Sequence, residues 1–150
     1  MSSKIFLDSS ILVEWAKKTQ VELFDHLATS SVHELCLSQV VLSEFTYYWL
    51  TIEGKKAPPT LKRDGSIPII LANHNPLRLL AKLTFLEPGA AVVPLYLQLM
   101  QQYNLLPNDA LILATCKLNG ITQLASYDAD FDTVCRDEGI WLIKSIGDLN

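Results

Sequence analysis

Short apolar runs alternate along the chain with stretches in which apolar residues recur at helical spacing. Residues 4–7 are largely apolar and predict a short buried strand, and the polar residues 8–10 can cap a helix that begins near Ser10. Apolar residues at 21, 24, 27 and 28 predict a second helix, and residues 34–37 predict a second strand. We therefore expect Asp8 at the carboxyl end of a strand.

The middle of the chain is predicted to be mainly helical. Residues 39–52 form a third predicted helix, because Val41, Phe45, Tyr48 and Ile52 share one face. Residues 53–76 hold two glycines and four prolines, which predicts a long surface connection with one short ordered piece at 69–71. Two further helices are predicted at 77–86 and 90–103.

The last third of the chain returns to alternating helices and strands. A helix is predicted from about residue 106 to 118, then strands at 123–126 and 140–143 with a short helix reaching residue 137 between them. This order predicts an α/β fold, a sandwich in which helices flank a mostly parallel sheet of short strands. Ligands of such folds bind beyond the carboxyl ends of the strands.

Composition limits the kind of protein. The 150 residues fit a single domain, 1–150, and 49% hydrophobic against 19% charged residues argues against disorder. No apolar run approaches the roughly 20 residues that span a bilayer, and the start of the chain turns charged too soon for a secretory signal. We expect a globular domain in the cytoplasm, without a membrane partner.

The net charge of −4 argues against broad, non-specific binding of nucleic acid, which needs a basic face. The densest basic stretch contains Lys55, Lys56, Lys62 and Arg63 and is interrupted by prolines, so it is expected on a loop. This stretch is either an ordinary solvated loop or a flap that contacts phosphate groups.

The cysteines and histidines do not indicate a disulfide framework or a zinc site. Cys36, Cys116 and Cys135 are far apart, odd in number and in mostly apolar contexts, as expected for reduced packing residues. The three histidines lack the His-Glu-x-x-His spacing and have no cysteine cluster nearby.

Four acidic residues interrupt or border the apolar segments: Asp8, Glu44, Asp109 and Asp128. Each has an ordinary explanation when taken alone, as a helix cap, an exposed helical position or a turn former. If they met at one edge of a sheet, their charges would repel, and a divalent cation would relieve that repulsion. Their joint occurrence therefore indicates a metal site.

Asp128, Asp130 and Asp132 alternate in a way that also suits a calcium loop. That interpretation fails on spacing, because Thr133 stands where the sixth-position glycine is needed and Gly139 where the twelfth-position glutamate is needed.

Four segments, residues 6–12, 42–45, 106–114 and 125–131, resemble in this order those of the PIN-domain ribonucleases, particularly the VapC-type toxins of toxin-antitoxin pairs. The resemblance covers almost the whole chain. It implies a metal-dependent endoribonuclease with a catalytic quartet around Mg²⁺ or Mn²⁺, made of Asp8, Glu44, Asp109 and Asp128. Asp130 would be an auxiliary or alternative fourth metal ligand.

The same resemblance implies that Ser126 is a supporting hydroxyl, that RNA is the substrate, and that the chain forms a homodimer. It also implies a cognate antitoxin whose segment lies along an apolar groove. Two features depart from the family pattern. Ser10 stands where members often carry asparagine, and residues 53–76 are longer than in compact toxins.

Two other classes of phosphate-handling protein fit the sequence less well, and one non-catalytic class remains as an alternative. A phosphatase of the haloacid-dehalogenase type needs a second aspartate two positions after the first, where this chain has Ser10. A phosphate-accepting receiver domain is disfavoured because no acidic pair accompanies the first strand. The remaining alternative is a non-catalytic PIN-like binding module, which predicts no metal binding.

Overall fold

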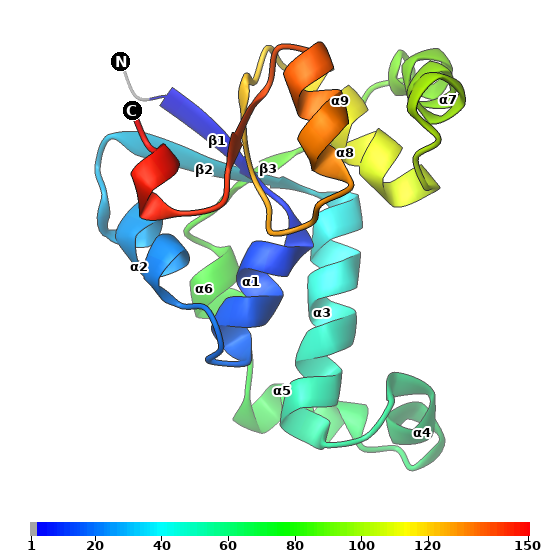
Figure 1. The fold of residues 1–150 in the computed structure, drawn as a ribbon. Coiled ribbons are helices and arrows are strands. Elements are labelled where there is room, and N and C mark those ends of the chain that lie inside the picture. Colours follow the sequence, from blue (N-terminus) through cyan, green and yellow to red (C-terminus); the bar gives the residue numbers. More distant parts are fainter. Residues whose placement is uncertain (1–2) are drawn as a thin grey trace.

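The structure, a computed structural model, describes residues 3–150 and is built on a five-stranded parallel sheet with the order β3-β2-β1-β4-β5 (Figure 1). The strands are β1 (Ser3–Leu7), β2 (His33–Ser38), β3 (Thr84–Leu86), β4 (Gln123–Ala125) and β5 (Trp141–Ile143). The central strand β1 pairs with β2 and β4, so that Ile5 faces Leu35 and Leu7 faces Ala125. Because all the strands run in one direction, their carboxyl ends share one edge of the sheet.

Helices cover both faces of this sheet, which confirms the predicted α/β sandwich (Figure 1). On one side lie α1 (Ser9–Ala16), α2 (Glu22–Thr29) and α3 (Gln39–Gly54). On the other lie α7 (Val92–Tyr103), α8 (Pro107–Leu118) and α9 (Phe131–Asp137). A short 3-10 turn, Ile146–Asp148, follows β5.

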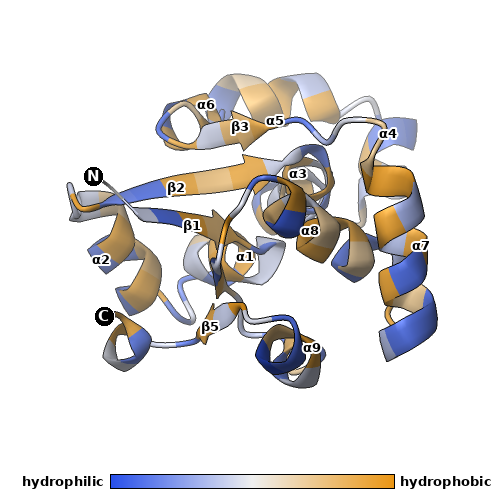
Figure 2. Ribbon diagram, turned by 90° about the horizontal axis from the view of Figure 1, so that it is seen from above, coloured by the Kyte–Doolittle hydropathy of each residue, from blue (hydrophilic) through white to orange (hydrophobic). Residues whose placement is uncertain are grey.

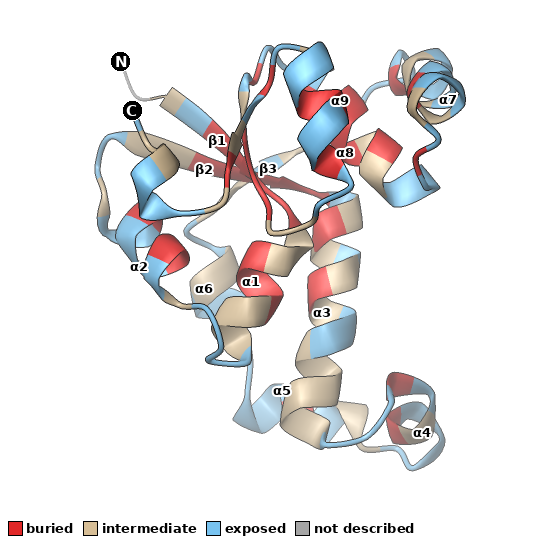
Figure 3. Cartoon of the chain, viewed as in Figure 1, coloured by how far each residue is buried: buried red, intermediate tan, exposed pale blue. Residues whose placement is uncertain are grey.

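The hydrophobic core lies along the central strands, where burial stabilises the fold most. Ile5, Phe6 and Leu7 of β1 are fully buried, and the carboxyl-terminal parts of the neighbouring strands β2 and β4 are buried as well (Figure 3). Along β2 the residues change from hydrophilic to hydrophobic toward its carboxyl end (Figure 2). All three cysteines are free and buried, which confirms their interpretation as packing residues. Within residues 3–150, no helix is long and apolar enough to cross a membrane.

Residues 53–76 contain two helices, α4 (Pro58–Arg63) and α5 (Ile67–Asn73), so the prediction of a long surface connection is wrong, although the ordered piece expected at 69–71 lies within α5. Pro58 and Pro68 occupy the first turns of these helices, where the missing N–H has no intrahelical partner to lose. Both helices are held by burial, since Leu61 and Ile70 pack around Gly54 at the end of α3. The prolines therefore start helices here.

The predicted helix at 77–86 is also wrong in its second half. Only α6 (Leu77–Leu80) is helical, and Thr84–Leu86 forms strand β3 beside β2, with Phe85 opposite Leu37. The apolar spacing in this stretch fits a helix, but an open position at the edge of the sheet favours strand pairing. Tertiary context overrides local preference at such positions.

Candidate functional site

Two of the acidic residues lie where the chain changes direction across the sheet. After β1, the chain forms β2 and then β3 on one side of β1 in the sheet. It then returns and forms β4 and β5 on the other side of β1. Asp8 directly follows β1, and its backbone N–H donates to the carbonyl of Ala125, at the end of β4, at 2.9 Å. Asp128 lies three residues beyond Ala125. Such a switch point is the usual ligand-binding place of open parallel sheets.

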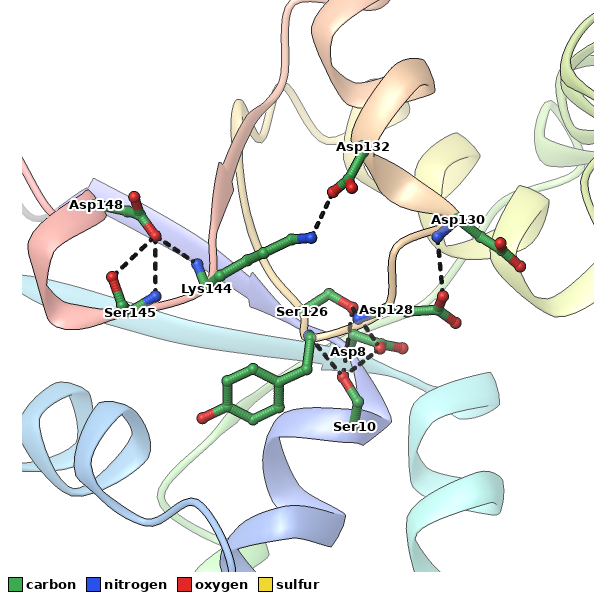
Figure 4. Close-up of polar contacts among 10 residues, drawn as sticks. Asp8, Ser10, Ser126, Asp128, Asp130, Asp132, Lys144, Ser145 and Asp148 are labelled. Carbon is green, nitrogen blue, oxygen red and sulfur yellow. Dashed lines mark hydrogen bonds and ion pairs between the residues drawn. The ribbon is translucent and has the colours of Figure 1, made fainter.

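Asp8 is buried and held by two hydroxyl groups (Figure 4). It occupies the N-cap position of α1, yet its side chain makes no capping hydrogen bond. Instead Oδ2 accepts hydrogen bonds from Ser10 and Ser126, each at 2.7 Å. No hydrogen bond from residues 3–150 reaches Oδ1 of Asp8, so the carboxylate is oriented with one oxygen available for a ligand.

The same hydroxyls connect Asp8 to the loop after β4. Ser10 Oγ accepts the N–H of Tyr127 at 3.0 Å, and Ser126 Oγ accepts the N–H of Asp128 at 3.0 Å. The family resemblance implied this supporting role for Ser126, whereas Ser10 was identified only as a departure from the family pattern. A hydroxyl two positions after an aspartate at a strand end was the available signal, because this spacing allows a local side-chain hydrogen bond.

Asp109, Asp128 and Asp130 form the tightest acidic group, with one oxygen of each within 4.8 Å of the others. Asp109 lies in the first turn of α8, and the loop after β4 carries the other two. Oδ1 of Asp128 accepts the N–H of Asp130 at 2.9 Å, which fixes the turn between them. In Figure 4 the carboxylates of Asp8, Asp128 and Asp130 point to the same side, toward α3 and α8.

Glu44 completes the acidic surroundings from the second turn of α3. Its Oε1 atom is buried and, within residues 3–150, has no hydrogen-bond partner. Burial and then the charge of Asp8 raise the pKa of Glu44, while the amide of Asn108 opposes this rise. A buried, unpartnered carboxylate oxygen is costly. It fits a site whose ligand is a cation.

The pKa of Asp109 is raised to about 6. The largest cause is burial, which disfavours the charged form, and the neighbouring carboxylates add to it. In decreasing order these neighbours are Asp128, Asp8, Asp130 and Glu44. The pKa of Asp109 is therefore raised by the charges of all four other candidate residues, although only Asp128 and Asp130 lie in its immediate group.

No lysine, arginine or histidine within residues 3–150 forms a salt bridge with any of these five acids. Lys144 comes near through its ion pair with Asp132, at 2.5 Å, which lies outside the acidic group (Figure 4). The negative charges thus stay uncompensated by the chain itself. A cluster of carboxylate oxygens of this kind suits hard divalent cations.

A known protein family and its members match this chain over most of its length. A sequence model of the PIN domain matches residues 5–137. Ribonuclease VapC2 of Methanocaldococcus jannaschii is 29% identical over 134 residues, which cover 88% of this chain and 89% of the relative.

Solved structures resemble the fold as well. A toxin-antitoxin complex from Klebsiella pneumoniae contains a chain with a TM-score of 0.60 at 17% identity, covering 93% of this chain and 96% of that one. VapC20 of Mycobacterium tuberculosis, a toxin described as cleaving the sarcin-ricin loop, has a TM-score of 0.58 at 18% identity, covering 87% and 94%. At these identities the likeness concerns the fold.

Proposed function

This chain belongs to the PIN domain family, and from that premise we propose that it is a metal-dependent endoribonuclease, the toxin of a toxin-antitoxin pair. The observation that carries the proposal is the convergence of Asp109, Asp128 and Asp130 at the switch point of the sheet, with no cation of the chain paired to them within residues 3–150. The name of the M. jannaschii relative, a ribonuclease, supports the choice of reaction.

The residues present fit a divalent cation such as Mg²⁺ or Mn²⁺. Asp109, Asp128 and Asp130 would hold it, and the charges of Asp8 and Glu44 act on Asp109 as well. When bound, such a cation orients a scissile phosphate and lowers the pKa of a water molecule, which then acts as the nucleophile. We propose Asp8, Glu44, Asp109 and Asp128 as the catalytic acids and Asp130 as a further metal ligand.

The chain's own groups contribute orientation and charge. The hydroxyls of Ser10 and Ser126 hold Asp8 in one rotamer, so no side-chain freedom is lost when a ligand binds. With a pKa of about 6, Asp109 is mostly ionised at neutral pH and is available as a ligand there. The buried oxygen of Glu44 gains a partner only when a cation or a proton reaches it.

The test is cleavage of a structured RNA by the purified protein with Mg²⁺, with Mn²⁺ and with EDTA. Asp109→Asn should lower the rate by at least about 100-fold, since it removes a charge that stabilises the bound cation. Asp132→Asn is the matched control, because Asp132 follows Asp128 and Asp130 in the chain but lies outside the acidic group and pairs with Lys144. Equal cleavage by Asp109→Asn and the wild type would contradict the proposal.

A non-catalytic binding module is the alternative, and metal binding separates the two. Calorimetric titration with Mn²⁺ should give saturable binding to the wild type and much weaker binding to Asp109→Asn. A folded protein that binds no Mn²⁺ and cleaves no RNA would favour the binding module.

We further propose an antitoxin partner, since one of the similar folds is from a toxin-antitoxin complex. A groove of about 780 Å³ between α1, α2, α3 and the segment around α6 is a suitable seat, because aromatic and aliphatic side chains form much of its wall. Among the residues that line it are Trp15, Phe24, Leu27, Trp49 and Leu79. Co-purification with the product of a neighbouring small gene, lost when the partly buried groove residue Leu79 is changed in a folded Leu79→Glu variant, would support this partner.

We also propose that the chain forms a homodimer. Helix α7 leaves Val93 and Leu97 about half exposed, at 52% and 51%. Apolar side chains of this size at a helix surface suit a second copy of the chain. Sedimentation of the wild type and of Val93→Glu would test it, and a monomeric wild type would contradict it.

A further inference from the structure

One face of α3 leads from the acidic site toward α4, the helix that follows it. Glu44, Tyr48, Thr51 and Lys55 follow one another at spacings of four, three and four residues, which places them on one face of a helix. Lys55 is the C-cap residue. The face therefore runs from the acidic site to the far end of α3 over about 16 Å, at 1.5 Å per residue.

Two tyrosines lie on or beside this face and are open to solvent. Tyr47 is 51% and Tyr48 49% exposed, and their rings meet edge to face with centroids 6.0 Å apart. Figure 3 shows an exposed stretch in the middle of α3, between buried first turns and the packed far end. Exposed aromatic rings next to a catalytic site are suitable platforms on which unpaired bases can stack.

Positive charge gathers where this face ends. Lys55, Lys56, Lys62 and Arg63 are all exposed, in a chain whose net charge is −4. Lys56 is engaged with Asp64 at 3.1 Å, but within residues 3–150 no salt bridge involves the other three. This is a local basic patch on an acidic protein, the electrostatic pattern of a phosphate-contacting surface.

The patch is held firmly in place relative to α3. A Cβ at Gly54 would lie 2.6 Å from Leu61 of α4 and 2.7 Å from Ile70 of α5, so the two short helices approach α3 as closely as a glycine allows. The segment that follows α5 is also held against α3, because Trp49 Nε1 donates a hydrogen bond to the carbonyl of His74 at 2.7 Å. Figure 1 shows α4 and α5 at the end of α3 away from the sheet.

We propose that this face is a track for single-stranded RNA, on which Tyr47 and Tyr48 stack bases and Lys55, Lys62 and Arg63 contact phosphates on one side of the cleavage site. The inference rests on the proposed function and adds to it a substrate-binding surface on α3 and α4, outside the acidic site. In A-form duplex RNA the bases are stacked inside the helix and cannot reach tyrosine rings. Without a bound cation the acidic site repels the substrate backbone, so in EDTA the binding energy has to come from a neighbouring surface.

The test is RNA binding without cleavage, measured by fluorescence anisotropy in EDTA on an Asp109→Asn background. The probe is a fluorescein-labelled single strand of twelve nucleotides of mixed sequence, compared with a duplex of equal length. Lys62→Glu together with Arg63→Glu should weaken binding of the single strand at least about tenfold at 50 mM salt. The slope of log Kd against log salt concentration should fall by about one to two.

The matched control reverses two charges elsewhere. Arg78→Glu together with Lys82→Glu changes the net charge equally, but these residues line the groove near α6. This control should change the Kd less than about threefold. Equal weakening by both pairs would overturn the inference, because it would mean that only overall charge matters.

The tyrosines give an independent readout. Tyr47→Leu together with Tyr48→Leu should weaken binding of the single strand about tenfold and leave the salt slope unchanged, since stacking is not an ionic contact. The duplex should bind more weakly than the single strand and be indifferent to this change. If the substitution alters sedimentation but not RNA affinity, the tyrosines belong to a contact between copies and the track is wrong.

Failure of this inference can be told from failure of the proposed function. Metal-dependent cleavage by the wild type, combined with unchanged binding by the charge-reversed and tyrosine variants, would overturn the track alone. A wild type that neither binds nor cleaves RNA would overturn both.

Discussion

The hydroxyl of Ser126 donates a 2.7 Å hydrogen bond to Oδ2 of Asp8 across 118 positions of the chain. The bond joins the carboxyl ends of β4 and β1, which are neighbours in the sheet. Since both side chains are buried, the bond is shielded from water. It sets the direction of the Asp8 carboxylate before any ligand arrives.

Ser126→Ala should therefore weaken metal binding more than it weakens the fold. The change removes two hydrogen bonds, one donated to Asp8 and one accepted from the N–H of Asp128, which costs about 1–3 kcal/mol of unfolding free energy. Loss of a group that orients a ligand typically costs about 10- to 100-fold in metal affinity. Mn²⁺ titration by calorimetry and urea denaturation measure the two effects separately.

Ser9→Ala serves as the control for that change, because Ser9 lies in the first turn of α1, directly after Asp8, and its side chain makes no hydrogen bond within residues 3–150. Its Mn²⁺ affinity should equal that of the wild type. If Ser126→Ala also keeps wild-type affinity, the hydroxyl has no part in orienting Asp8 for a metal.

Asp109→Asn should stabilise the metal-free protein at neutral pH. Burial and neighbouring charges disfavour the ionised side chain, as its raised pKa of about 6 shows, and asparagine keeps the shape without the charge. Because the carboxyl is only half-buried, solvent screening reduces the effect to about 1 kcal/mol, or about 2–4 °C in Tm. Differential scanning calorimetry in EDTA measures it, and a clear loss of stability would contradict the electrostatic argument.

The stabilisation by Asp109→Asn should depend on pH in a defined direction. The native state holds the Asp109 proton up to about pH 6, whereas the unfolded chain loses it near 3.8. Between these values the native state binds more protons, so this residue's contribution to stability decreases as pH rises and stays low above pH 6. Urea denaturation in EDTA should show a small gap between the two proteins at pH 4.5 and the full gap at pH 7.5.

Metal affinity should follow the same ionisation in the opposite direction. A cation competes with the proton on Asp109, so the apparent affinity for Mn²⁺ should decrease as pH falls below about 6. Calorimetry at pH 5 and pH 7.5 tests this, with weaker binding expected at the lower pH. Equal affinity at both values would mean that Asp109 is not a metal ligand.

Gly54→Ala should destabilise the protein although alanine is the better helix former. The new Cβ would lie within 3 Å of Leu61 and Ile70 side-chain atoms, and overpacking of this kind costs about 1–3 kcal/mol. The gain in helix propensity is at most about 1 kcal/mol. We expect a net loss of about 1 kcal/mol by urea denaturation. Gly89→Ala, with open space around it, should show no such loss.

Local patterns predicted most elements of the fold. The spacing of apolar residues indicated α3, α7 and α8 nearly to their ends, and the short apolar runs indicated β1, β2, β4 and β5. Strand β3 was missed because a three-residue strand at a sheet edge has no pattern of its own and forms only beside β2. Helix α4 was missed, and α5 was expected only as a short ordered piece at 69–71, because proline marks both a helix start and a loop.

The sequence by itself determined which acids border the apolar segments, and hence that Asp8, Asp109 and Asp128 would be near strand ends or a helix start. Only the tertiary structure decided that Asp130 joins Asp109 and Asp128 in the tightest group, and that both serine hydroxyls bind the same oxygen of Asp8. The physical reason is that distances between side chains remote in sequence depend on which strands pair and on how each helix is rotated against the sheet. Neither quantity is encoded in any one local segment.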